Sequence, residues 1–117
     1  MARHSASKIE ISSFIERLFG YDLHRKCDDI RPYYRYEASC PESVPQAIVA
    51  FLDSSDFESA VRLAVSLGGD SDTIACITGG IAEAFYGSIP KDIEDYVMNI
   101  LPEEFQTVVR KVQDLPL

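Results

Sequence analysis

Apolar residues that recur every three or four positions are the feature that most restricts how this 117-residue chain can fold. This spacing places side chains on one face of an α-helix. The first such set is Ile11, Phe14, Ile15 and Leu18. Ser7 and Glu10 form a capping-box pattern ahead of it, and Gly20 is placed to end the helix.

Four further stretches repeat the pattern, and two of them begin with capping-box pairs, Ser43 with Gln46 and Ser55 with Glu58. The last two begin near prolines. Their expected apolar faces are Val44, Ala47, Ile48 and Phe51; Phe57, Val61, Ala64 and Val65; Ile93, Val97, Ile100 and Leu101; and Phe105, Val108, Val109 and Val112. The sequence therefore predicts an all-α fold in one domain over residues 1–117, with residues 1–7 flexible.

Residues 21–42 follow neither the helical nor the strand period. Tyrosines alternate there with charged residues and Pro32. We expect a long ordered loop with one short strand near Tyr34, and loops of this length in compact domains are often functional.

The stretch from Ser71 to Tyr86 is apolar almost all round, as is usual for a buried helix. Gly79 and Gly80 lie inside it, and each costs about 1 kcal/mol relative to Ala. We expect close approach of another helix to offset this cost. Gly87 is placed to end the helix.

Composition excludes several classes of protein. The net charge of −8 argues against nucleic acid as a partner, because phosphate binding needs clustered Lys and Arg. No stretch approaches the about 18 apolar residues that span a membrane. Cys27, Cys40 and Cys76 are odd in number and form no C-x-x-C pair, so free thiols in a reducing cytoplasm are the simplest interpretation.

One segment suggests chemistry, Gly68-Gly69-Asp70-Ser71-Asp72-Thr73 at the start of the expected buried helix. Its two carboxylates can converge only if the turn before the helix is non-helical, and the two glycines give the backbone that freedom. A plain helix N-terminus would also favour Asp here. However, two buried carboxylates disfavour joint ionisation without a cation, and Mg²⁺, Mn²⁺ or Ca²⁺ would accept these oxygens.

Two alternative sites fail on spacing. A calcium-binding EF-hand loop that started at Asp70 would need Gly at its sixth position and Glu at its twelfth, where the chain has Ala75 and Ile81. A phosphate-binding loop needs a Gly-Lys-Ser/Thr sequence, and none follows.

The same segment, continued through Ile74-Ala75, Gly79-Gly80-Ile81-Ala82 and Phe85-Tyr86-Gly87, resembles the C-terminal signature of the ADP-ribosylglycohydrolases. Weaker similarities lie upstream, in Gly20-Tyr21-Asp22-Leu23, Ile30-Arg31-Pro32, Ser43-Val44-Pro45 and Ala50-Phe51-Leu52. Glu83 departs from the pattern, because many relatives have Gly there. The resemblance covers most of residues 8–110.

The resemblance implies an orthogonal all-α bundle, of which this chain holds the C-terminal part. It implies a two-metal site with Mg²⁺ or Mn²⁺ that cleaves the glycosidic bond of ADP-ribose adducts, so the substrate would be an ADP-ribosylated molecule. Asp70, Asp72 and Thr73 match metal ligands of the family, and no catalytic residue is assigned. The tyrosines of the 21–42 loop could stack on adenine, and packing of the loop explains them equally well.

The remaining ligands of the family come from an upstream Thr-Asp-Asp motif and a further acidic residue, and this chain lacks both. Asp28 and Asp29 are not substitutes; we expect them to be solvated or to cap a loop. We therefore expect the chain to be a truncated gene product or a segment started at an internal Met. We expect it to be inactive alone and to associate as a homodimer or with a complementing N-terminal half. The alternative is a non-catalytic helical interaction module.

Overall fold

The computed structural model describes residues 5–36 and 39–116, and all regular structure in that part of the chain is helical. The helices are α1 Lys8–Phe19, α2 Cys27–Ile30, α3 Cys40–Asp53, α4 Phe57–Ser66, α5 Ser71–Tyr86, α6 Lys91–Ile100 and α7 Glu103–Gln113. The all-α prediction is therefore confirmed. Of the residues 1–7 that were expected to be flexible, 1–4 lie outside the described residues, and Ser7 caps α1.

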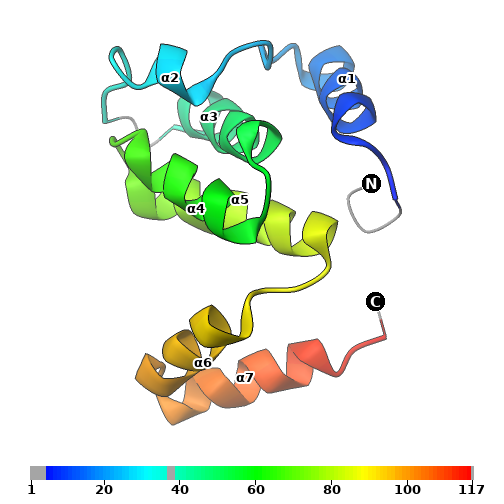
Figure 1. The fold of residues 1–117 in the computed structure, drawn as a ribbon, viewed down its shortest axis with the longest axis vertical. Coiled ribbons are helices and arrows are strands. Elements are labelled where there is room, and N and C mark those ends of the chain that lie inside the picture. Colours follow the sequence, from blue (N-terminus) through cyan, green and yellow to red (C-terminus); the bar gives the residue numbers. More distant parts are fainter. Residues whose placement is uncertain (1–4, 37–38, 117) are drawn as a thin grey trace.

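Helix α3 is the central element, with α1 and α2 on one side and α4 and α5 on the other (Figure 1). Nearly every residue of α3 from Ser43 to Phe51 is buried. The prediction that Ser71–Tyr86 is the buried helix is wrong in this respect. Helix α5 has the predicted bounds, but it lies at the edge and buries only the stripe Ile74, Thr78 and Ala82.

The two helix glycines of α5 meet no closely packed neighbour. A Cβ atom added to Gly79 would make ordinary contact with Val61 at 3.8 Å, and one added to Gly80 would meet nothing within 4 Å. The expected close approach of another helix is therefore wrong for the described residues, because α5 turns its Gly80 face outward.

Two predicted helix starts are shifted. Helix α4 begins after Asp56, whose carboxylate accepts the backbone N–H of Ser59 at 2.7 Å, so the capping pair lies one residue beyond Ser55 and Glu58. Helix α3 begins three residues before the expected cap Ser43. Pro45 is therefore inside the helix, close enough to its start that the missing proline N–H removes only an early hydrogen bond. The 21–42 loop contains the short α2, and the described part of that loop holds no strand near Tyr34.

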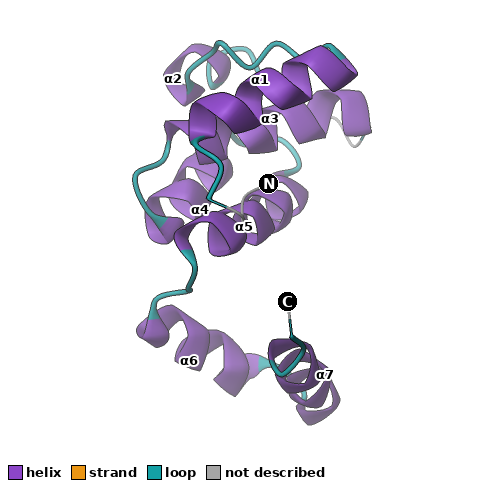
Figure 2. Ribbon diagram, turned by 90° about the vertical axis from the view of Figure 1, so that its right-hand side faces the viewer, coloured by secondary structure: helices purple, strands orange, loops and turns teal. Residues whose placement is uncertain are grey.

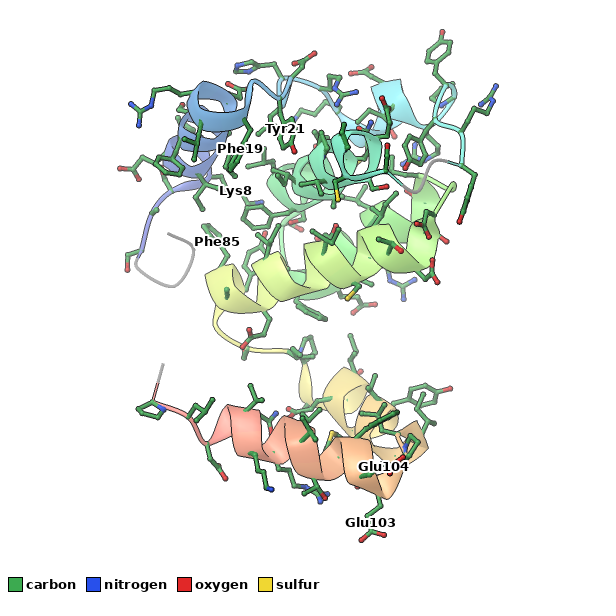
Figure 3. The ribbon with its side chains drawn as sticks, turned by 180° about the vertical axis from the view of Figure 1, so that it is seen from behind. Lys8, Phe19, Tyr21, Phe85, Glu103 and Glu104 are labelled. Carbon is green, nitrogen blue, oxygen red and sulfur yellow. The ribbon has the colours of Figure 1, made fainter. Side chains whose placement is uncertain are left out.

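One lysine contributes to the attachment of helix α1 to this body. The Lys8 ammonium donates to the backbone carbonyls of Leu52, at 3.2 Å, and Ser54. It also lies 5.0 Å from the ring centre of Phe51 and 5.8 Å from that of Phe85, within range of cation–π attraction (Figure 3). Ile11 is the only fully buried residue of α1, and Ile15 packs partly buried against the core, so this polar contact adds to a small apolar one.

Helices α6 and α7 stand apart below α4 and α5, after the linker of residues 87–90 (Figures 1 and 2). Each begins after a proline, Pro90 and Pro102, as predicted. The side chains of Gln113 and Glu94 link the two helices by a hydrogen bond of 2.9 Å. No residue of either helix is fully buried, and most of their large apolar side chains are exposed.

Candidate metal-binding site

The segment before α5 turns sharply through two glycines. Gly68 and Gly69 have φ values of 77° and 60°, in the left-handed region that favours glycine. Asp70 follows with ψ at 64°, which is not helical, and the helix begins at Ser71. A side chain on Gly69 would overlap the Tyr34 ring and lie 3.1 Å from the Arg35 carbonyl oxygen. The turn is therefore specified both by backbone conformation and by close packing.

This turn brings the two carboxyl groups together. A side-chain hydrogen bond with Asp70 is the main cause that lowers the pKa of Asp72, followed by the backbone N–H of Thr73, which donates to Asp72 Oδ1 at 3.0 Å. Two acids this close repel one another when both are ionised. A cation would relieve that repulsion and accept both oxygens.

The expectation that this helix start is buried is wrong. Asp72 and Thr73 are exposed, and Asp70 is only partly buried. The reason is the edge position of α5, whose first turn faces solvent in this chain. What favours a cation at these carboxylates is therefore that they are close together, not that they are buried.

The donor set fits part of a hard-cation site. Asp70, Asp72 and Thr73 offer carboxylate and hydroxyl oxygens, which Mg²⁺ and Mn²⁺ prefer. In the part of the chain that the structure describes, no group of three or more His, Cys, Asp or Glu side chains is placed to hold a metal ion. Magnesium binding at the three residues remains a prediction.

A pocket of about 440 Å³ opens beside the turn, on the other side of Tyr34 and Arg35. Its wall combines tyrosine rings with guanidinium and amide groups, and Arg25 donates to the Gln46 side chain at 3.1 Å. The lining residues are Arg25, Asp29, Ile30, Tyr33, Tyr34, Arg35, Tyr36, Glu42 and Gln46. The tyrosines of this wall stand out in the sequence, but Arg25, Arg35 and Gln46 do not, because no pattern in the chain marks side chains that meet only after α2 and α3 pack together.

The acids excluded as ligands have structural partners. Asp28 forms an ion pair with Arg31 at 2.6 Å, and Asp29 accepts the backbone N–H of Lys26 at the start of α2. Both are exposed, so the prediction that they are solvated or cap a loop is confirmed.

All three cysteines are free thiols, as predicted. Cys76, however, is exposed, because it lies on the outer face of α5. No helix of the described residues is long and apolar enough to cross a membrane.

Comparison with known proteins gives consistent partial matches. Human ADP-ribosylhydrolase ARH3 is 41% identical over 76 residues, which cover 56% of this chain and 18% of that protein. The ADP-ribosylarginine hydrolase Tri1 of Serratia proteamaculans is 40% identical over 52 residues, covering 43% of this chain and 14% of the relative. The putative ADP-ribosyl glycohydrolase L543 of Acanthamoeba polyphaga mimivirus is 48% identical over 46 residues, covering 38% and 14%.

The matched segments thus span less than a fifth of the length of these relatives. No solved structure matches the chain significantly. The model of the ADP-ribosylglycohydrolase family matches residues 3–115, nearly the whole sequence. On this match, and on the Gly-Gly-Asp-Ser-Asp-Thr turn at the start of α5, the chain belongs to the ADP-ribosylglycohydrolase family.

Proposed function

We propose that this chain contributes the cation ligands at the start of α5 to a divalent-cation site. The enzyme that contains this site would hydrolyse the glycosidic bond of ADP-ribose adducts. The observation that carries the proposal is the turn at Gly68 and Gly69, packed against Tyr34, which places Asp70 and Asp72 at the start of α5. The relatives named as ADP-ribosyl hydrolases support the reaction class. The three free thiols support a reducing compartment such as the cytoplasm.

In this proposal Asp70, Asp72 and Thr73 hold Mg²⁺ or Mn²⁺. A bound divalent ion lowers the pKa of the water molecule that attacks the glycosidic bond. The two carboxylates fix the position of the ion, and the Thr73 hydroxyl adds a third oxygen on the same helix turn. Glycoside cleavage places positive charge on the sugar ring, which nearby carboxylates stabilise.

The neighbouring pocket suits the remainder of the substrate. Arg25 and Arg35 can pair with a diphosphate, since guanidinium groups bind phosphate oxygens through two hydrogen bonds. The rings of Tyr33 and Tyr36 can stack on a base. Tyr34 contacts the turn and also lines the pocket, so the two features lie next to each other.

A non-catalytic interaction module is the second candidate. The uncovered apolar faces of α6 and α7 favour it, because such faces in soluble proteins usually bind a partner. The two functions are compatible in one chain, so the site must be tested directly.

Calorimetric titration with Mn²⁺ tests the cation site. We expect weak binding that the double variant Asp70→Ala, Asp72→Ala abolishes, because two carboxylates supply only part of an octahedral set. The matched control is Asp92→Ala with Glu94→Ala, an acidic pair of the same spacing in the first turn of α6. Identical titrations for the wild type and the Asp70/Asp72 variant would contradict a cation site at this turn.

Hydrolysis of ADP-ribosyl-arginine tests the reaction. The pure chain with Mg²⁺ should show no turnover, because its three ligands cannot hold two cations. Turnover should appear when a family segment that supplies further carboxylates is added, and Asp72→Ala should remove it. Activity of the complemented protein that persists in Asp72→Ala would contradict the proposed role of this residue.

A further inference from the structure

The turn before α5 joins two firmly packed residues through two glycines. Leu67, just before the turn, is 2% exposed, and Ile74, one turn into α5, is fully buried. Gly68 and Gly69 lie between them and bring no side chain that could pack. Because glycine adopts many backbone conformations at similar energy, the two glycines allow the observed turn but do not select it. The direction in which Asp70 enters α5 must therefore be fixed by neighbouring residues.

Tyr34 packs on the second of these glycines. A Cβ atom added to Gly69 would overlap the Tyr34 ring, which therefore lies directly against this part of the backbone. The ring is itself held in place, because it packs on the hydrophobic core around Ile30 and Leu67 and its hydroxyl oxygen is buried. The backbone N–H of Tyr34 also donates to the Ile30 carbonyl at 2.9 Å. Tyr34 is thus a fixed wall that limits where Gly69 can move.

Arg31 binds the chain just before the turn. Its guanidinium group donates from Nε to the backbone carbonyl of Ser66 at 3.1 Å and from Nη2 to the Ser66 hydroxyl at 2.9 Å. Ser66 is the last residue of α4, so the first bond satisfies one of the carbonyls that a helix end leaves without a partner in the helix. The same guanidinium pairs with Asp28 of α2 at 2.6 Å. A planar guanidinium can form these bonds together, whereas a lysine ammonium cannot reproduce their geometry.

We infer that Arg31 and Tyr34 are positioning residues, which hold the turn at Gly68 and Gly69 in the conformation that presents Asp70 to a divalent cation. Both belong to the segment that follows α2, at the same end of the helical body as the turn (Figure 1). Arg31 fixes the chain ahead of the two glycines, and Tyr34 fixes the second glycine itself. Neither side chain contacts the cation; each acts through the backbone of the turn. The inference rests on the proposed cation site and names the residues that set its geometry.

The two glycines provide the first test, and it needs no metal ion. Both have positive φ, so an added methyl group strains either backbone, but only at Gly69 does it meet the Tyr34 ring; at Gly68 it meets nothing within 4 Å. Hydrogen exchange of the Ile74 amide, which donates to the Asp70 carbonyl at 3.0 Å, reports on the turn. Gly69→Ala should raise this exchange rate about tenfold or more above that of Gly68→Ala, and a Tyr34→Ala background should remove most of the difference. Equal rates in Gly68→Ala and Gly69→Ala would overturn the inference, and so would a difference that persists without the Tyr34 ring.

Mn²⁺ titration, followed by paramagnetic broadening of the amide signals at the turn, tests the link to the cation. Tyr34→Ala and Arg31→Lys should each weaken binding about tenfold or more, the usual cost of losing a residue that orients a metal ligand. Tyr34→Phe should bind Mn²⁺ as the wild type does, because it keeps the ring. The matched controls are Tyr96→Ala on α6, where the ring is 68% exposed, and Arg62→Lys on α4, where the side chain is exposed and pairs with Glu58. Both controls should leave the affinity unchanged.

The two measurements separate failure of the inference from failure of the proposed function. A wild type without broadening at the turn would contradict the cation site, and the exchange rates would still decide whether Tyr34 holds the turn. A wild type that binds Mn²⁺ no more tightly than Tyr34→Ala and Arg31→Lys would overturn the inference and leave the cation site standing. Binding is compared between variants with the helix content of the wild type. If Tyr34→Ala does not fold, Arg31→Lys, at a partly exposed residue, decides the titration alone.

Discussion

Helices α3 and α7 show how far an amphipathic pattern determines the fate of a helix. They have 14 and 11 residues, and the sequence assigns an apolar face to each. Helix α3 buries eight of its residues among its neighbours, whereas α7 buries none. The difference shows that an apolar helical period predicts a helix but not its burial. Burial depends on neighbouring elements that the rest of the sequence must supply.

The largest difference in stability should come from removing one aromatic ring from α3 and one from α7. Phe51→Ala in α3 should lower the free energy of unfolding by about 3–5 kcal/mol, because Phe51 is fully buried and packs edge-on against Phe85 at 5.1 Å. Phe105→Ala in α7 should change it by less than about 0.5 kcal/mol at dilute concentration, because the ring is 54% exposed. Urea unfolding of both variants checks this. Equal losses would mean that α7 is packed as tightly as α3.

High pH should lower the free energy of unfolding through ionisation of Cys27, which lies in the helical core and not in α7. Burial, followed by repulsion from Asp53, raises the pKa of this thiol from 9.0 to about 11. The folded state therefore keeps a proton that the unfolded chain releases above about pH 9. Stability is intact below that pH and falls as pH rises toward 11, by about 2–3 kcal/mol in total.

Urea unfolding between pH 8 and pH 11 measures how steeply the free energy of unfolding falls with pH because of Cys27. Cys27→Ala should flatten this part of the curve, while Cys76→Ala, which alters an exposed thiol, should leave it unchanged. A Cys27→Ala protein that loses stability as steeply as wild type would show that other groups control the alkaline range.

Substitution of two lysines, one in each region, should give a stability difference of intermediate size. Lys8→Met should cost about 2 kcal/mol, because it removes charge-assisted hydrogen bonds to the Leu52 and Ser54 carbonyls while it keeps the apolar stem. Lys91→Met in α6 should cost little, since Lys91 is exposed and forms a surface ion pair with Asp95. Thermal melts of the two variants are the measurement, and a larger loss for Lys91→Met would reverse the ranking of the two regions.

The smallest contrast compares two threonine hydroxyls that donate to backbone carbonyls. Thr78→Val removes a buried bond of 2.9 Å from α5 to Ala47 in α3 and should cost about 1 kcal/mol. Thr107→Val removes a bond of 3.0 Å within exposed α7 and should change stability by less than about 0.5 kcal/mol. Chemical unfolding at matched temperature distinguishes the two, and indistinguishable midpoints would remove hydrogen bonding as a source of the difference.

Local signals predicted the elements better than their surroundings. The bounds of α5 and the Ser7 cap follow from glycines and from a capping pair that act within one turn. The exposure of Gly80 and Cys76 did not follow, because an all-round apolar sequence does not specify which faces receive neighbours. Helix α2 was missed because its four residues are too few to show a period.

The candidate site divides in the same way. The turn at Gly68 and Gly69 follows from adjacent residues, so the sequence was sufficient to predict it. The pocket formed by Arg25, Arg35 and Gln46 depends on packing between residues up to 21 positions apart, such as the bond from Arg25 to Gln46. Nothing in the spacing of those side chains marks them in advance.

The attachment of α1 has a consequence for the order of folding. Helices α3, α4 and α5 follow one another through short turns, so their contacts close small loops and can form rapidly. The Lys8 contact to Leu52 and Ser54 closes a loop of more than 40 residues, since the first of these bonds joins positions 44 apart. Backbone amides of α1 should therefore exchange with solvent deuterium before those of α3, through an opening that releases α1 and leaves the central three helices intact.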